Sequence, residues 1–405
     1  LIKEGIAPLR HSYSTSVTYF ALQLKSNSIS FRGASAAMQI LSTHNTIPKA
    51  PSHETCIQWN LKVGLYKLQR EKKSLGEWCW IVDHVLGSGP MKCLAVLGVP
   101  TSVLQEKKDL TLCLDDVEPF GLIPMSRSTG KEVNEALLQI SSQTGIIPRS
   151  IISDHGSDLW LGIKSFCKEQ DNKTLEHYDV CHKVAVELKR LFLGDPLWNK
   201  FSEHAAQAKR ELYNTEGVCY APPNQRRKSR YQNTDILIGW ACKILACKEQ
   251  MPLPVLNKLK WVFDYQESII HWQQWIEIGQ ETRNEIRQCG FGDNAEDRLM
   301  HRLLSIKMTK VSENLACNFI DYIAFESSKL SFGEKSFGST EIIESLFGYY
   351  KNTQGIWDSC GGIGRLILTM ASKVGELSKE IVQTALEVVR IQDVKSWLKN
   401  SLIYL

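Results

Sequence analysis

The stretch Ser150-Ile-Ile-Ser-Asp-His-Gly-Ser-Asp158 decides how the middle of this chain folds. The β-branched residues Ile151 and Ile152 precede a serine and Asp154, and a His-Gly pair follows. This order predicts a short buried strand that delivers Asp154 into a loop at its end. The alternative is that Asp-His-Gly forms only a turn, because Asp and Gly both favour turns. Acids on neighbouring elements would favour the first interpretation.

Composition limits the class of protein. A chain of 405 residues is too long for one ordinary core, so we expect two or three domains. Hydrophobic residues make up 43% and charged residues 23%, which is typical of globular proteins and excludes wholesale disorder. The net charge of +4 is small, so nucleic-acid binding has to be judged from local clusters of basic residues.

Apolar runs and cysteines predict the compartment. No apolar run approaches the roughly 18 to 20 residues that span a bilayer, so we expect no membrane association. We expect no signal segment, and we expect a native start to be missing, since the chain opens with Leu1-Ile2-Lys3. The 12 cysteines form no C-x-x-C pair. They predict reduced thiols of a cytoplasmic protein, with neither zinc nor disulfides.

Residues 16–75 have the pattern of basic helices. Helical apolar spacing runs through 30–41, and a Pro-containing break follows at 47–51. Ser52 can then cap a helix from Glu54 to about Gln69. Helix, short connection, helix is the layout of a helix-turn-helix, whose second helix reads base edges.

This region also carries the first candidate DNA contacts. Five basic residues stand between Lys62 and Lys73, and Lys62 and Lys67 are the two that we expect to meet DNA. The alternative is a small helical bundle with a solvated charged face.

After Gly76 the pattern changes to strands mixed with helices. The order is three strands, a helix, a strand, a helix and a strand, which indicates an α/β layer structure. The expected strands are 78–85, 93–99, 120–124, the stretch from Ile151, and 175–180, and the expected helices are 129–144 and 159–168.

A long helical region follows, from His182 to about Phe332. Its tryptophans are expected mostly in the core. The Gly/Ser-rich residues 333–339 predict a loop, after which Thr340 starts a helix that carries Glu341 and Glu344. The tail from 361 to 405 is helical, with four expected core residues: Ala371, Val374, Leu377 and Val389.

Three acids stand on these elements in an order that suits phosphodiester chemistry. Asp83 lies on the first strand, Asp154 at the end of the fourth, and Glu344 on the late helix. Two hard cations about 3.5 to 4 Å apart can activate a nucleophile and stabilise the leaving oxygen. Carboxylates are ligands that Mg²⁺ prefers, and their mutual repulsion without metal favours bound cations.

The segments that carry these acids resemble the DDE transposases of bacterial insertion sequences. The helix-turn-helix before the α/β part and the helical insertion before the third acid fit the same family. The resemblance covers about residues 15–390, and the order of the motifs is more specific than any one of them. The matching segments are Trp80-Ile-Val-Asp83, Ile151-Ile-Ser-Asp-His-Gly-Ser-Asp-Leu159, Tyr178-Asp-Val-Cys-His-Lys183 and Glu344-Ser-Leu-Phe-Gly-Tyr-Tyr-Lys351.

The resemblance implies an α/β ribonuclease H-like catalytic core, interrupted by a large all-α insertion and preceded by a helix-turn-helix DNA-binding domain. It implies that Asp83, Asp154 and Glu344 are catalytic and hold two Mg²⁺ ions, for which Mn²⁺ can substitute. Glu341 competes for the third place, and Asp158 competes with Asp154 but is expected to cap the next helix. The implied regions are 1–75 (helix-turn-helix), 76–183 (core, first part), 184–335 (insertion) and 336–405 (core, last part, with the third acid and C-terminal helices).

The same resemblance suggests further DNA contacts. They are the acid-free basic loop with Arg226, Arg227, Lys228 and Arg230, then Lys351 on the face of Glu344, and His182 after the fifth strand. The alternatives are a solvated loop, a surface lysine, and a satisfied core histidine behind a helix cap at Asp179.

The implied function is DNA transposition. The protein would cleave transposon ends with metal ions and transfer the freed 3′ hydroxyl into target DNA, as a homodimer or larger assembly on double-stranded DNA. One alternative is a domesticated, non-catalytic DNA-binding protein. Another is a ribonuclease H-like nuclease without strand transfer.

A first prediction concerns the basic loop. Changing Arg226, Arg227, Lys228 and Arg230 together to Ala should weaken binding to all duplexes alike, because phosphate contacts carry no sequence information. Four lost contacts would reduce the log–log salt slope by roughly 3 to 4 units. The measurement is affinity for random duplexes across a salt series. An unchanged slope would show that the loop is solvated surface.

Overall fold

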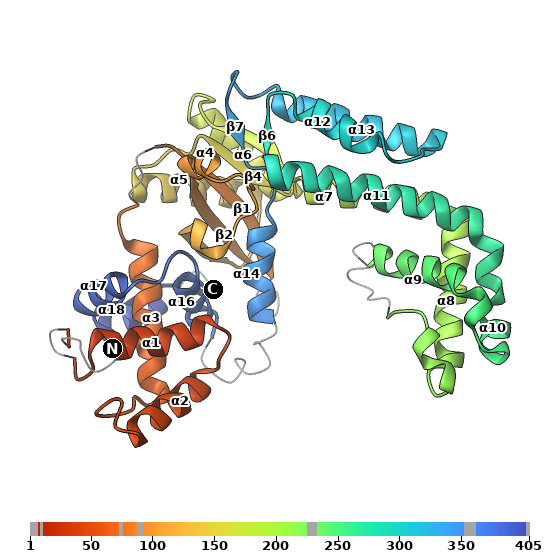
Figure 1. The fold of residues 1–405 in the computed structure, drawn as a ribbon. Helices are drawn as coiled ribbons and strands as arrows, with labels where there is room; N and C mark the ends of the chain where they lie inside the picture. The colour runs from red at the N-terminus through yellow and green to blue at the C-terminus, as the bar shows by residue number, and fades with distance from the viewer. Residues whose placement is uncertain are drawn as a thin grey trace. The chain divides into compact units, whose positions relative to one another are not determined.

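The computed structural model describes residues 7–8, 11–72, 76–86, 92–224, 233–351 and 362–401 (Figure 1). The chain divides into two compact units. The first consists of Leu1–His177 and Ser339–Leu405, and the second is the intervening segment Tyr178–Gly338. The interruption of the first unit therefore begins six residues before the expected 184–335 and ends three residues after it.

A five-stranded mixed sheet forms the centre of the first unit. Its order is β3-β2-β1-β4-β5. The hairpin neighbours β1–β2 and β2–β3 are antiparallel, whereas β1 and β4 are parallel. This confirms the predicted α/β fold class, and each of the five strands lies where the sequence predicted one. The strands are β1 (Trp78–Leu86), β2 (Lys92–Pro100), β3 (Glu118–Met125), β4 (Ser150–Ser153) and β5 (Leu175–Tyr178).

One face of the sheet is covered by α5 (Gly130–Thr144) and α6 (Ser157–Glu169), with which Trp80, Val82 and Ile151 form a buried cluster. The two helices pack against each other closely enough to require glycine at Gly162. A Cβ atom there would come within 2.6 Å of Val133 and 2.8 Å of the Gly130 carbonyl oxygen. A short helix, α4 (Ser102–Glu106), follows β2, and a 3-10 turn, η1 (Leu114–Asp116), precedes β3.

The remaining helices of the first unit come from both ends of the chain. Serines at 14, 30 and 52 cap the three N-terminal helices, each accepting a backbone N–H three residues on. The predicted cap at Ser52 is thus confirmed. The helices are α1 (Thr15–Ser26), α2 (Phe31–Thr43), α3 (His53–Gln69), α14 (Glu341–Lys351), α16 (Gly362–Lys373), α17 (Lys379–Val388) and α18 (Ile391–Ser401).

The N-terminal helices pack on the C-terminal helices, with α3 between α2, α16, α17 and α18. Gly64 of α3 allows the closest approach, since a Cβ atom there would lie 1.9 Å from the Leu368 carbonyl oxygen. From Cys56 to Leu68 every residue of α3 is buried or half-buried. The helix has no exposed face for a DNA groove in this fold, so we correct the expectation that it reads base edges.

The same packing corrects the expectation that Lys62 and Lys67 contact DNA. Lys67 is fully buried, and its ammonium donates to the carbonyls of Ser372, Val374 and Gly375 at 3.1, 2.8 and 2.9 Å. Burial lowers the pKa of Lys67 to about 7. Lys62 is 7% exposed, and burial lowers its pKa as well. These basic residues lie inside the bundle because helices far along the chain cover them.

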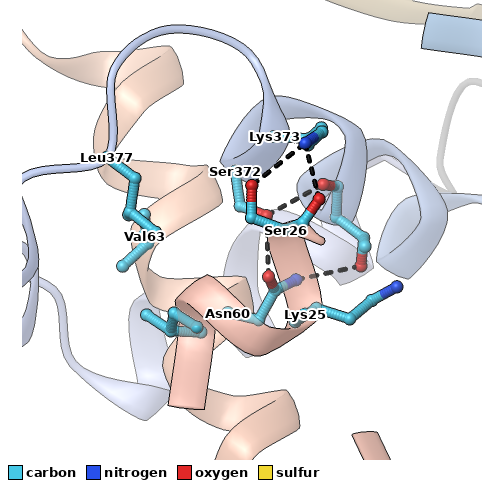
Figure 2. A pocket seen from close by; sticks show the side chains of 9 residues that line it. Lys25, Ser26, Asn60, Val63, Ser372, Lys373 and Leu377 are labelled. Carbon is cyan, nitrogen blue, oxygen red and sulfur yellow. Dashed lines mark hydrogen bonds between the residues drawn. The ribbon is translucent and has the colours of Figure 1, made fainter. Parts of the chain in front are cut away.

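A polar network joins α1, α3 and α16 (Figure 2). Asn60 donates to the Thr369 hydroxyl at 3.2 Å and accepts from the Ser372 hydroxyl at 2.7 Å. Lys373 donates to the carbonyl and hydroxyl oxygens of Ser26 at 2.6 and 3.0 Å. These groups line a cavity of about 10 Å³, room for about one water molecule. The network ties residues more than 300 positions apart into one bundle.

The second unit is helical, as expected. Its longest helix, α11, packs against α7, α9, α12 and α13. The backbone N–H of Val180 donates to the Gly338 carbonyl at 2.9 Å, so the two ends of the unit meet. The helices are α7 (Val180–Gly194), α8 (Pro196–Leu212), α9 (Thr234–Ala246), α10 (Leu253–Leu259), α11 (Gln266–Cys289), α12 (Ala295–Leu303) and α13 (Lys310–Ser327), with 3-10 turns η2 (Glu216–Tyr220), η4 (Lys248–Gln250) and η5 (Lys260–Tyr265).

The tryptophans of this unit lie in its core, as predicted: Trp198, Trp272 and Trp275 are buried, and Trp240 and Trp261 pack partly buried against them. The expected loop 333–339 contains a difference. Its residues Lys335–Ser336 form a two-residue strand, β7, that pairs antiparallel with β6 (Phe291–Gly292). Among the described residues, no helix is both long and apolar enough to cross a membrane.

The buried ammonium of Lys67 generates a stability prediction. Lys67→Met keeps the side-chain length but removes the donor to three carbonyls at the end of α16. Since one hydrogen bond to a charged group contributes about 1.5–3 kcal/mol, we expect the unfolding free energy to fall by about 3 kcal/mol.

The measurement is urea unfolding, with Lys131→Met as the matched control on a side chain that is 83% exposed. An equal, small effect of both substitutions would contradict a structural role for Lys67.

Candidate active site at the ends of two parallel strands

Asp83 and Asp154 stand at equivalent positions on neighbouring parallel strands. The last paired residues of β1 and β4 are Ile81 and Ile152, and each aspartate lies two residues further on. In a parallel pair, aligned residues project to the same face of the sheet. The two carboxylates therefore share one face, with Asp83 within β1 and Asp154 directly after the end of β4. It is the face opposite to α5 and α6, because the alternate residues of β1 form the cluster under those helices.

Helix α14 brings the third predicted acid to the same strand. It packs against β1, the strand that carries Asp83. Its buried face is formed by four apolar residues: Ile342, Ile343, Leu346 and Phe347. Glu344 is exposed at the flank of that face, so it does not point into the core. Glu341, the competing acid, is half-buried one turn earlier.

The donors fit a hard divalent cation in kind, since all are carboxylate oxygens. The three carboxylates do not come together at one point. Within the ranges that the structure describes, no three His, Cys, Asp or Glu side chains are close enough together to hold one ion. The structure thus aligns Asp83 with Asp154 and sets α14 against β1, while Glu344 does not complete a three-carboxylate group.

The turn after β4 fixes the orientation of Asp154. The predicted strand is present as Ser150–Ser153, and the aspartate follows it directly. Asp154 Oδ1 accepts the backbone N–H of Gly156 at 2.8 Å. His155 between them has a φ of 56°, the left-handed region that a non-glycine residue rarely adopts. Its ring Nε2 pairs with Glu176 of β5. Strand and turn, offered as alternatives by the sequence, are both present.

Asp83 is oriented in a similar way. Its Oδ1 accepts the backbone N–H of His84 at 2.6 Å. The ring of His84 lies on the other face of the sheet, where Nε2 is 2.8 Å from the Ser128 hydroxyl and Nδ1 is 3.7 Å from Asp158 Oδ2. Lys92 Nζ is 3.4 Å from the same oxygen. The pKa of His84 is lowered, mainly because the side chain is buried. The charge of Asp158 raises this pKa and the charge of Lys92 lowers it, both to a smaller extent.

Asp158 differs from its expected role as a helix cap. The N-cap of α6 is Gly156, which has no side chain to cap with, and Asp158 lies in the first turn. Burial raises the pKa of Asp158, but a hydrogen bond from Ser128 and the charges of His84 and Lys92 lower it overall. The residue therefore serves as the partner of His84 and Lys92.

Sequence reasoning missed these partners: His84, Lys92, Ser128, His155 and Glu176. One signal was available, since both predicted aspartates are followed by a histidine, in Asp83-His84 and Asp154-His155.

The remaining predicted residues lie elsewhere. In the second unit, Asp179 caps α7 by accepting the N–H groups of Cys181 and His182 at 3.1 Å each, which confirms the expected cap. His182 is half-buried, with its ring 6.0 Å from that of Tyr178. Lys351 ends α14, and its side chain lies outside the described residues. The basic loop with Arg226, Arg227, Lys228 and Arg230 is outside them as well.

Comparison with known proteins gives no independent assignment. No known family model matches the chain, and no curated protein sequence is significantly similar to it.

Two like charges at matched positions generate a prediction about stability. Asp154→Asn keeps the oxygen that accepts the Gly156 N–H and removes one charge. In chelator, relief of the repulsion from Asp83 should raise the unfolding free energy by about 1 kcal/mol. Added Mn²⁺ should then raise the Tm of the wild type more than that of the variant.

The measurement is thermal unfolding with chelator and with Mn²⁺. Asp171→Asn is the control, because the Asp171 side chain is 85% exposed. Identical Tm values for wild type and Asp154→Asn under both conditions would show that the aspartates do not share a site.

Proposed function

We propose that this protein is a DDE-type DNA transposase with a ribonuclease H-like catalytic core. The observation that carries the proposal is the matched register of Asp83, within β1, and Asp154, directly after the adjacent parallel strand β4, with the helix of Glu344 packed against β1. Central strands that present aspartates side by side, followed by a glutamate on a late helix, are what the resemblance implies. The helical second unit between the second and third acids agrees with the same arrangement.

The chemistry assigned to this face is phosphoryl transfer. Strand cleavage and strand transfer are both in-line displacements at phosphorus, and neither needs a covalent enzyme intermediate. Bound Mg²⁺ or Mn²⁺ would supply an activated oxygen nucleophile and stabilise the leaving oxygen. Asp83 and Asp154 would hold the cations, with Glu344 as the third donor and Glu341 as its alternative. The chain itself orients two of these carboxylates through the backbone N–H groups of His84 and Gly156.

The partners follow from the reaction. Double-stranded DNA is the substrate, both as transposon ends and as target, and joining two ends requires a dimer or larger assembly on DNA. The loop with Arg226, Arg227, Lys228 and Arg230 is the proposed phosphate-binding segment, with His182 and Lys351 as further candidates. We place the protein in the cytoplasm, associated with DNA.

One observation favours a second candidate, a domesticated DNA-binding protein without catalysis. The described acids do not gather around a single point. A nuclease without strand transfer would need the same acids, and only the products of the reaction distinguish it from a transposase.

The test separates chemistry from binding. Asp154→Asn should lower Mn²⁺-dependent nicking of a supercoiled plasmid by about 10²–10³-fold, the scale on which loss of one electrostatic group lowers a rate. Affinity for a random duplex, measured in chelator, should stay within about twofold of the wild type. Asn has the size of Asp, and the substitution removes none of the basic side chains that bind phosphate.

Asp171→Asn is again the control, with wild-type activity expected in both assays. Wild-type protein that binds DNA but never nicks it would support the domesticated protein. Nicking that survives in Asp154→Asn at the wild-type rate would exclude Asp154 as a metal ligand. Products joined to target DNA distinguish the transposase from the simple nuclease.

A further inference from the structure

The two aspartates share a second feature: each is followed by a histidine whose ring is held by an acid outside the site. His84 meets Asp158 of α6 and Ser128, which lies just before α5. His155 meets Glu176 of β5. These side chains are mostly shielded, with 10% exposure for His84, 18% for Asp158, 22% for His155 and 16% for Glu176. Such shielding lets a pair of this kind hold its geometry better than an exposed ion pair does.

Each histidine is connected to its aspartate through one backbone N–H group. The N–H of His84 itself donates to Asp83 Oδ1 at 2.6 Å. The N–H of Gly156, immediately after His155, donates to Asp154 Oδ1 at 2.8 Å. A peptide group can orient a carboxylate only if it is itself fixed, and the ring of the neighbouring histidine fixes it to a separate element of the fold.

The backbone at His155 strengthens this interpretation. A φ of 56° is unfavourable for histidine and easy for glycine, so the position would accept Gly with less strain. The pair with Glu176 on the adjacent strand offsets that strain. A side chain in a strained conformation that is held by a shielded partner is a feature of positioning residues in active sites.

We propose that His84 and His155 are positioning residues, which orient Asp83 and Asp154 through the pairs His84–Asp158 and His155–Glu176. This inference rests on the proposed role of the two aspartates as cation ligands. It predicts that changes at Asp158 and Glu176, the outer members of the pairs, weaken cation binding.

The experiment measures the affinity of the metal-free full chain for Mn²⁺ alone, by calorimetry. Glu176→Ala and Asp158→Ala should each raise the dissociation constant about 10- to 100-fold, the range found when groups that orient metal ligands are removed. Glu176→Gln and Asp158→Asn keep an oxygen that can accept from the ring, so each should recover most of the affinity. Rescue by the amide distinguishes positioning from loss of a negative charge near the cation.

His155→Gly removes the ring without adding backbone strain, so a loss of Mn²⁺ affinity in this variant does not arise from a disturbed turn. It permits the left-handed turn but has no ring, so the Mn²⁺ affinity should fall as in Glu176→Ala, with the Tm in chelator within a few degrees of the wild type. Glu135→Ala is the control for an exposed acid of the same unit, 61% exposed on α5, and should bind Mn²⁺ as the wild type does.

The outcomes separate this inference from the proposed function. If Asp154→Asn reduces Mn²⁺ binding but Glu176→Ala, Asp158→Ala and His155→Gly bind normally, the positioning role is overturned and the metal site stands. If the wild type binds no Mn²⁺, or Asp154→Asn binds it equally well, the metal site fails and the positioning role fails with it.

Discussion

The parallel register between β1 and β4 is the constraint on which the site depends. The pairing of Ile81 with Ile152 sets Asp83 opposite Asp154, and alternation of side chains puts both on one face. A slip of one residue would move one aspartate under α5 and α6, where Trp80 and Ile151 belong. Burial of those apolar residues and placement of the acids are therefore enforced by the same pairing. The apolar residues that must face α5 and α6 thus determine on which face of the sheet the two aspartates lie.

A second constraint is that the first unit is closed by both ends of the chain. Lys67 of α3 holds the carbonyls at the end of α16, and Asn60 binds Thr369 and Ser372 across more than 300 positions. Contacts of such separation form late in folding, because a long loop has to close first. The second unit shortens that loop, since its own ends meet where Val180 binds Gly338. Its folding brings the chain back to deliver α14 to the sheet.

The sequence was sufficient for elements whose signal is local. A continuous apolar run located β1, Ser52 located the start of α3, and the Ile-Ile-Ser-Asp pattern located β4 and the acid that follows it. It was insufficient where the deciding neighbour is distant. Lys62 and Lys67 looked like surface groups, because nothing near them in the chain indicates α16 or the carbonyls it offers. Asp158 looked like a cap for a related reason, since its partner His84 lies 74 positions earlier, on β1.

The three acids are held by different physical means. Backbone pairing fixes Asp83 within β1 and the strand β4 that ends next to Asp154, and adjacent N–H groups orient both carboxylates. Glu344 is carried by α14, which packs through an apolar face that includes Ile343 and Leu346. A helix can rotate or slide against a sheet by small shifts of such contacts, whereas a strand in the middle of a sheet cannot move without breaking its ladder. The position of the third acid therefore depends on side-chain packing, whereas that of the two aspartates depends on the backbone pairing of the sheet. On these grounds the alignment of the two aspartates is built into the sheet, whereas the position of Glu344 depends on how one helix packs against it.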